Sequence, residues 1–147
     1  MKLHDNYMCL EFPSKSTNES FARTVVAAFA ARMDPTIEEI GDIKTAVSEA
    51  VTNCIVHAYP NEIGIVQIKC RILRENVLEI IVKDRGRGIE NLSRAMEPLF
   101  TTGNEERSGM GFTIMENFMT SLKVKSSVGK GTTIHMRRKI VNRGDSR

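Results

Sequence analysis

The chain has 147 residues, of which 41% are hydrophobic and 27% are charged. This length and balance predict one globular core, because two cores would each be marginal in size and a disordered chain would be less apolar. The formal net charge is +3, and residues 137–147 hold five Lys or Arg against one acidic residue. The net positive charge therefore comes from the C-terminal end, which includes a basic tail at about 139–147. This placement argues against direct contact with nucleic acid.

The cysteines Cys9, Cys54 and Cys70 are odd in number and have no CxxC spacing. This pattern argues against a zinc site and against a disulfide framework. The sequence contains no apolar signal-peptide segment, and no run approaches the roughly 18–20 apolar residues that span a bilayer. We therefore expect a cytoplasmic protein with reduced thiols and no association with a membrane.

The start of the sequence predicts one strand and one helix. Residues 8–12 place apolar side chains at alternate positions before a proline, which predicts a strand. Ser16 and Glu19 have the spacing of a capping box and predict the start of the helix. Its apolar side chains recur at helical spacing and are Phe21, Val25, Ala28, Phe29 and Met33.

A second, longer helix is the most strongly periodic segment of the chain. Asp34 fits its N-cap and Pro35 its first position, and the helix ends near Tyr59. Its apolar stripe consists of Ile37, Ile40, Ile43, Val47, Val51, Cys54 and Ile55.

The rest of the sequence predicts a hairpin, a long loop, a helix and a second hairpin, at residues 65–83, 85–108, 109–122 and 124–138. The loop holds a short helical piece at 92–96, and loops of this length usually act as lids or binding loops. Because the strands arrive in adjacent pairs, we predict an α+β two-layer sandwich. Its sheet would be mixed but mainly antiparallel, with the helices on one face, in a single domain over residues 1–147.

Three polar residues, Glu49, Asn53 and His57, follow one another at intervals of four on the second helix. At about 100° per residue they lie within an arc of roughly 80°. The spacing alone fits a solvated polar face, with a histidine near the C-terminal end of the helix. It also fits a site that gathers a carboxylate, an amide and an imidazole.

Two glycine motifs offer backbone to a ligand. Asp84-x-Gly86-x-Gly88 follows a strand, and Gly109-x-Gly111 opens a helix whose N–H groups could meet a phosphate. Each motif by itself also fits an ordinary turn or hinge. A Walker A loop, a Rossmann fingerprint and a serine nucleophile elbow are all absent from the sequence.

Taken in order, these motifs and Gly131-Thr132 match the boxes of the GHKL or Bergerat ATP-binding family, which the chain therefore resembles. The stretches that narrow the resemblance are residues 18–23, 47–53, 98–102 and 106–119. They are similar to the serine protein kinases of this family that act as anti-sigma factors in sporulation. The resemblance covers nearly the whole chain.

The resemblance implies a homodimeric kinase that binds Mg²⁺ and ATP or ADP. It implies that Asn53 is the protein ligand of Mg²⁺ and that Glu49 is the catalytic base for a partner's serine hydroxyl. It implies that Asp84 accepts the adenine amino group. The other nucleotide-binding positions that it implies are Gly86, Gly88, Thr102, Arg107, Gly109, Met110, Gly111 and Thr132.

Within that set, the glycines at 86 and 88 would let the backbone pass beside the base, and Thr132 would complete the adenine side. The segment 109–111 would present N–H groups to the phosphates, and Arg107 would reach the γ-phosphate. An ATP lid is expected at about 98–111. The sequence departs from the family at 102–104, where a Lys-Pro pair is missing and the lid is about one residue shorter. No lysine contact to phosphate is therefore expected there.

The implied protein partners are a sigma F-type RNA polymerase sigma factor, which is held inactive, and a STAS-domain anti-anti-sigma protein, which is phosphorylated. Glu19 and Arg23 lie on the side of the first helix away from Phe21 and Val25, and they are candidates for docking a partner. An exposed arginine is also commonly just solvated. His57 is interpreted as a capping or packing residue, and Arg85 and Arg87 receive no function.

Three alternatives share these motifs. A sigma B-type anti-sigma kinase has the same fold and the same Glu-Asn-His box. A histidine-kinase catalytic domain has the same ATP site but needs a dimerisation helix, for which this sequence has no room. A binding module switched by nucleotide would need no carboxylate at position 49 beside the γ-phosphate.

Overall fold

The computed structural model describes residues 6–97 and 108–141, with only the backbone of Ser108 and Gly109. The elements, in chain order, are β1 (Tyr7–Pro13), α1 (Thr17–Ala30), a 3₁₀ turn η1 (Ala31–Met33), α2 (Ile37–Thr52), a π-helical segment η2 (Asn53–Ala58), β2 (Ile65–Leu73), β3 (Val77–Asp84), α3 (Leu92–Ala95), α4 (Ser108–Phe118), β4 (Ser121–Ser127) and β5 (Gly131–Lys139). Within the described residues, no helix has the length and apolar character that a membrane span requires.

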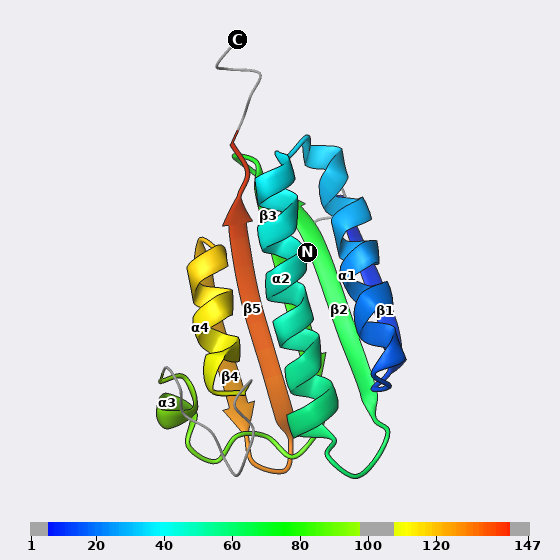
Figure 1. Cartoon of the computed structure of the whole chain (residues 1–147), viewed down its shortest axis with the longest axis vertical. Coiled ribbons are helices and arrows are strands. Elements are labelled where there is room, and N and C mark those ends of the chain that lie inside the picture. Colours follow the sequence, from blue (N-terminus) through cyan, green and yellow to red (C-terminus); the bar gives the residue numbers. More distant parts are fainter. Residues whose placement is uncertain (1–5, 98–107, 142–147) are drawn as a thin grey trace.

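The described strands form one sheet in the order β1-β2-β3-β5-β4, and every neighbouring pair runs antiparallel. Helices α1, α2 and α4 lie side by side over one face of this sheet (Figure 1). The two-layer α+β architecture is therefore confirmed. The parallel pairing that a mixed sheet would allow does not occur among these strands.

The core fills the space between the sheet and the helices. Alternate side chains of the central strands point into it, as the period of two predicts. Val82 of β3 stands opposite Ile68 of β2 and Ile134 of β5, and all three are buried. The helices contribute fully buried Ile43, Val47, Val51 and Met115 to the same core.

The start of α2 differs from the prediction. Asp34 adopts a left-handed conformation with φ of 53° and ends η1, so it cannot serve as the extended N-cap. Thr36 is the N-cap instead. Its hydroxyl accepts a hydrogen bond from the N–H of Glu39 at 3.0 Å, and the Glu39 carboxylate accepts one from the N–H of Thr36 at 2.8 Å. The capping box of this protein therefore begins α2.

The predicted capping box at Ser16 does not form, because Ser16 has helical backbone angles and makes no side-chain cap bond. The predicted apolar face of α1 is also wrong in part, since the side chain of Phe21 is 51% exposed. The buried face of α1 consists of Ala22, Val26, Phe29 and Ala30. Two of these four residues are small alanines, so packing in the core, rather than side-chain size, selects the buried face.

The last turn of the second helix and the end of α4 also differ from the prediction. The second helix does reach Ala58, but its last turn is π-helical rather than α-helical. Helix α4 ends at Phe118, so Leu122 belongs to β4 instead of the helix. The C-terminal end of this second helix, the loop after β3, α3, the first turn of α4 and the β4–β5 turn all meet at one end of the sandwich (Figure 1).

Candidate functional site

A cavity of about 960 Å³ lies at the end of the sandwich where these segments meet. Its wall includes Asn53 and His57 of η2, Asp84 at the end of β3, Gly88 after it and Thr132 of β5. Residues 89–95, which include α3, form another side of the cavity. Four positions that the sequence assigned to a nucleotide site, at 53, 84, 88 and 132, thus line one cavity.

Asp84 is a buried carboxylate in the wall of this cavity, with 4% of its surface exposed. Its Oδ1 accepts hydrogen bonds from the N–H groups of Gly86 at 3.0 Å and Thr132 at 3.1 Å. Burial raises the pKa of Asp84 above its ordinary value, and these bonds, with one from the Cys54 thiol, limit that rise. A carboxylate held in this way can accept a hydrogen bond from an amino group of a ligand.

The loop after Asp84 passes between two other backbone segments. A Cβ atom on Gly86 would collide with the carbonyl group of Ala58, and one on Gly88 would collide with that of Ser127. Gly88 also has φ of 76°, which favours glycine. The space that these glycines leave open is therefore occupied by backbone of the protein itself, which fixes the loop and the orientation of Asp84.

Glu49 and Asn53 converge on the first turn of α4. Their side-chain oxygens lie 3.5 Å and 3.4 Å, respectively, from the point that a Cβ atom on Gly111 would occupy. Both side chains are half-buried. The absence of a side chain at Gly111 thus leaves a space that a carboxylate and an amide face together.

The π-helical turn begins at Asn53 and carries His57 to the same cavity wall. The N–H of Tyr59 reaches back to the carbonyl oxygen of Cys54 at 3.3 Å, the i to i+5 bond of a π-helix. Such turns occur frequently at functional sites. His57, interpreted from sequence as a capping or packing residue, therefore lines the cavity beside Asn53.

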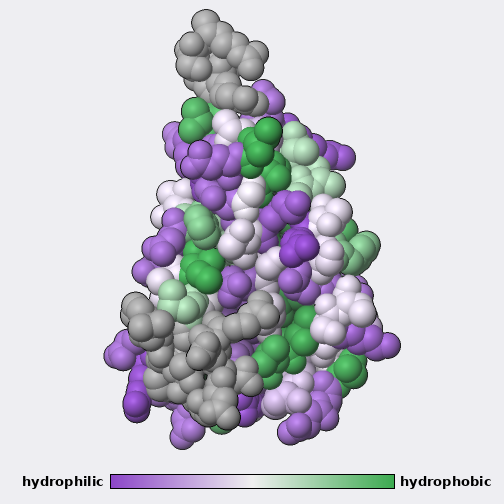
Figure 2. Space-filling model, in the orientation of Figure 1, coloured by the Kyte–Doolittle hydropathy of each residue, from purple (hydrophilic) through white to green (hydrophobic). Residues whose placement is uncertain are grey.

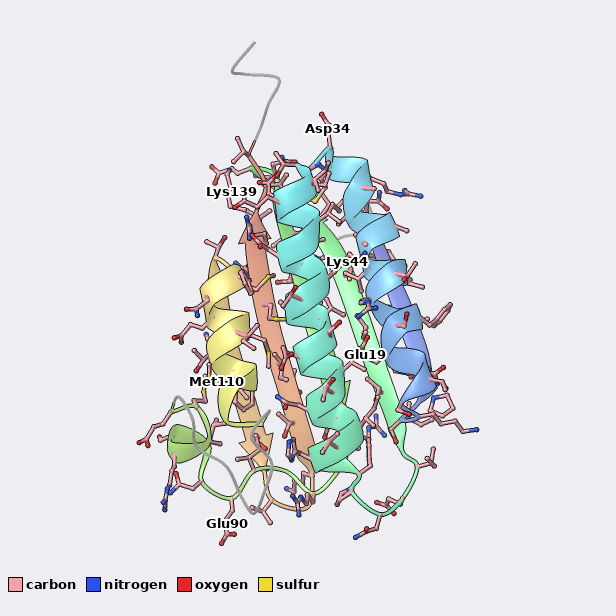
Figure 3. The ribbon with its side chains drawn as sticks, viewed as in Figure 1. Glu19, Asp34, Lys44, Glu90, Met110 and Lys139 are labelled. Carbon is pink, nitrogen blue, oxygen red and sulfur yellow. The ribbon has the colours of Figure 1, made fainter. Side chains whose placement is uncertain are left out.

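The first turn of α4 supplies backbone N–H groups to this region. Gly109, Met110 and Gly111 lie at the N-terminus of an 11-residue helix, where unpaired N–H groups and the helix dipole favour an anion. Figure 3 shows Met110 at this end of α4, with Glu90 on the loop below it in the view. Thr102, Arg107 and residues 98–107 of the expected lid lie outside the described residues.

Glu19 and Arg23 lie outside the cavity and face α2 (Figure 3). Their side chains are 3.3 Å apart, and both reach the hydroxyl of Ser48 at 3.4 Å. The predicted apolar face of α1 would have left both side chains on the solvent side of the helix. In the structure they contact α2 instead. Their contact on α2 is the residue next to Glu49.

Sequence reasoning missed the segment that holds the Asp84 loop. Tyr59 is buried, and its hydroxyl accepts a hydrogen bond from the N–H of Arg85 at 2.7 Å, while Ala58 accepts one from the N–H of Arg87 at 3.1 Å. The sequence pattern predicts only the end of a helix at this point. No local pattern relates residues that are 26 positions apart in the chain.

Comparison with known proteins identifies the family of this chain. Residues 12–138 match the family of histidine kinase-like ATPase domains. The anti-sigma F factor of Caldanaerobacter subterraneus subsp. tengcongensis is 64% identical over 134 residues, which cover 90% of this chain and 93% of that protein. The anti-sigma F factor of Clostridium acetobutylicum is 57% identical over 136 residues, covering 92% and 94% of the two chains. The chain belongs to the anti-sigma F factor family.

Solved structures similar to this anti-sigma F factor family member show the shared fold. The RsbU and RsbW domains of Rv1364c from Mycobacterium tuberculosis match 92% of this chain and 32% of that chain, with a TM-score of 0.69 and 16% identity. The Erythrobacter litoralis EL346 blue-light activated histidine kinase matches 73% of this chain and 32% of that chain, with a TM-score of 0.57 and 27% identity. The cavity described above therefore lies in a histidine kinase-like ATPase fold.

Proposed function

We propose that this chain is an ATP-dependent serine protein kinase and an anti-sigma factor. It holds a sigma F-type RNA polymerase sigma factor inactive, and it phosphorylates a STAS-domain anti-anti-sigma protein with Mg·ATP. It works as a cytoplasmic homodimer. The observation that carries this proposal is the convergence of Glu49 and Asn53 on Gly111, at the N-terminus of α4.

The nucleotide occupies the cavity with its base beside Asp84. The Asp84 carboxylate accepts the adenine amino group, and the Thr132 side chain, whose hydroxyl lies 2.7 Å from that of Ser126, borders the same side. The phosphates lie toward the N–H groups of residues 109–111. Thr102 and Arg107 lie outside the described residues, and we assign them to phosphate contacts on the family resemblance alone.

The residues at 49 and 53 fit a magnesium ion that arrives with a nucleotide. Mg²⁺ prefers oxygen ligands and keeps several waters and phosphate oxygens, so it needs few ligands from the protein. The amide oxygen of Asn53 is its protein ligand. When bound, the ion neutralises charge on the phosphates.

Glu49 acts on the partner's serine. Its carboxylate orients the hydroxyl and takes its proton as the serine oxygen bonds to the γ-phosphorus. The bond between that phosphorus and the β–γ bridging oxygen breaks, and its electron pair leaves with ADP. Because phosphoryl transfer depends mainly on positioning and charge stabilisation, a carboxylate fixed one helical turn from Asn53 suits this role.

Glu19 and Arg23 contribute to partner docking. They border Ser48, next to the catalytic base, and the Arg23 side chain remains 40% exposed. On this face, hydrophobic side chains lie in separate patches among hydrophilic ones (Figure 2). A partner would therefore meet a mixed polar and apolar surface, and arginine is enriched in such interfaces.

The test is intact mass spectrometry of a STAS-domain partner after incubation with this chain and Mg·ATP. The wild-type chain should add one phosphate, and Glu49→Gln should slow the transfer by about 100-fold or more while still binding Mg·ATP. The matched control is Glu38→Gln, an exposed acid in the first turn of the same helix. Transfer by Glu49→Gln at the wild-type rate would exclude Glu49 as the base. ATP binding without any phosphate transfer would indicate a nucleotide-switched module, which a sigma-factor pull-down would then examine.

A further inference from the structure

Tyr59 joins three segments of the chain next to the Asp84 loop. It caps η2, and only 6% of its surface is exposed. Its hydroxyl donates a hydrogen bond to the carbonyl oxygen of Ile65 at 2.9 Å and accepts one from the N–H of Arg85 at 2.7 Å. Its ring lies against Gly64, where any side chain would collide with it. Tyr59 thus contacts the start of β2 and the loop after β3 while it ends the helical segment.

The hydrogen bond between Arg85 and Tyr59 restrains the Asp84 loop. Arg85 directly follows Asp84, so the Tyr59 hydroxyl fixes the backbone immediately after the carboxylate that faces the cavity. The neighbouring carbonyl of Ala58 fixes the same loop two residues later, through the N–H of Arg87. The loop is therefore bound twice to the end of η2.

The same helical segment carries Asn53 at its other end. A continuous helical run from Ile37 to Ala58 thus holds Asn53 in one wall of the cavity, with Glu49 one turn before it. Through Tyr59, the same run holds Asp84 in another wall. The distance between the phosphate side and the base side of the site depends on this connection. Cys54, on the same π turn, adds a third contact through its thiol to Asp84.

We propose that Tyr59 is a positioning residue, whose hydroxyl fixes Asp84 relative to Asn53 and thereby sets how strictly the site selects adenine. This inference rests on the proposed ATP site. If the Tyr59 hydroxyl served stability alone, its removal would lower the free energy of unfolding without changing the preference of the site for adenine. Selection depends on where Asp84 stands, because the carboxylate accepts a hydrogen bond from the amino group of adenine but meets a carbonyl oxygen in hypoxanthine.

The variant Tyr59→Phe tests this, because it keeps the ring and removes only the hydroxyl. In nucleotide-free protein, we expect hydrogen exchange at the Arg85 amide to accelerate by about fivefold, as the loss of one hydrogen bond allows. We expect ATP to bind about fivefold more weakly and the preference for ATP over ITP to fall by a similar factor. The control is Tyr7→Phe, the other tyrosine of the chain, which is partly exposed on β1.

Urea unfolding of both variants separates positioning from stability. An unchanged preference for ATP over ITP in Tyr59→Phe, with exchange at Arg85 as slow as in wild type, would overturn the inference. The inference would also be overturned if hydrogen exchange accelerated equally at all amides, by the amount that a lower free energy of unfolding explains. If the wild-type chain binds no ATP, the proposed function fails, whereas the exchange measurement still reports whether Tyr59 holds the loop.

Discussion

The carbonyl group of Ala58 occupies the space into which a Cβ atom on Gly86 would project. Gly86→Ala must therefore push the Asp84 loop away from η2. We expect this substitution to lower the free energy of unfolding by about 1–3 kcal/mol, the usual cost of overpacking. We also expect ATP affinity to fall at least tenfold, because the loop carries Asp84. Urea unfolding and calorimetric titration measure the two effects.

Gly41→Ala is the matched control for this prediction. Gly41 lies in α2, and no atom stands within 4 Å of the position of an added Cβ. Alanine there should raise the free energy of unfolding by about 0.5–1 kcal/mol, because glycine is the poorer helix former, and leave nucleotide binding unchanged. Equal effects of the two substitutions would contradict the tight packing at Gly86.

Asp84→Asn should separate nucleotide binding from stability. Burial raises the pKa of Asp84, so ionisation of this group is more costly in the folded protein than in the unfolded chain. The resulting destabilisation is complete above the folded-state pKa and disappears below the model-peptide value of 3.8. We expect the variant to be at least as stable as wild type at pH 7, with any excess shrinking as the pH falls to 3.8.

The same variant should bind ATP at least tenfold more weakly. The amide oxygen of the asparagine would keep the hydrogen bonds from the N–H groups of Gly86 and Thr132, which leaves the amide nitrogen toward the ligand. An amide nitrogen cannot accept a hydrogen bond from the adenine amino group. Urea unfolding at the two pH values and calorimetric titration at pH 7 provide the measurements. A large loss of stability at pH 7 together with intact ATP binding would refute the role given to this carboxylate.

Asn53→Ala should weaken nucleotide binding in a magnesium-dependent way. With Mg²⁺ present, we expect ATP affinity to fall about tenfold, because loss of the metal's protein ligand costs on that order. With EDTA present, the variant and wild type should bind ATP equally. Titrations under both conditions check this. Equal losses with and without magnesium would instead indicate that Asn53 contacts the nucleotide directly.

Glu79 should make stability depend on pH. It is 2% exposed, and Arg71, His135 and Arg137 all contact its carboxylate within 3.1 Å. Burial alone would raise the pKa of Glu79, but hydrogen bonds from His135 and Arg71, and their charges, hold it below its ordinary value. A depressed folded-state pKa contributes stability that is present above the unfolded-state pKa and is lost as the pH falls through the folded-state pKa.

Glu79→Gln should accordingly lower the free energy of unfolding at pH 7 by about 2 kcal/mol, because it removes charge-assisted hydrogen bonds. The difference from wild type should shrink as the pH falls below about 4. Glu11→Gln, an exposed acid on β1, should have little effect at either pH. Urea unfolding across this range is the measurement, and a deficit that does not change with pH would argue against the ionic role.

The sequence by itself determined the parts of this protein that depend on short-range patterns. The period of two at residues 65–72 predicts β2, the turn at Glu75 and Asn76 is present with positive φ at both residues, and the segment 92–96 contains α3. These features are visible locally because strand alternation and turn conformation depend on neighbouring residues. The ordered glycine and Glu-Asn-His motifs likewise contain five residues that line one cavity, namely Asn53, His57, Asp84, Gly88 and Thr132.

Only the tertiary structure decided which faces and loops meet. On α1 the small Ala22 is fully buried, whereas the larger Phe21 is 51% exposed, so packing in the core and not side-chain size selects the buried face. The contact of Glu49 and Asn53 with Gly111 joins α2 to α4 across a long stretch of chain. The hydrogen bond from Arg85 to Tyr59 likewise links distant residues. Such contacts form through packing of the whole core, so no local sequence pattern contains them.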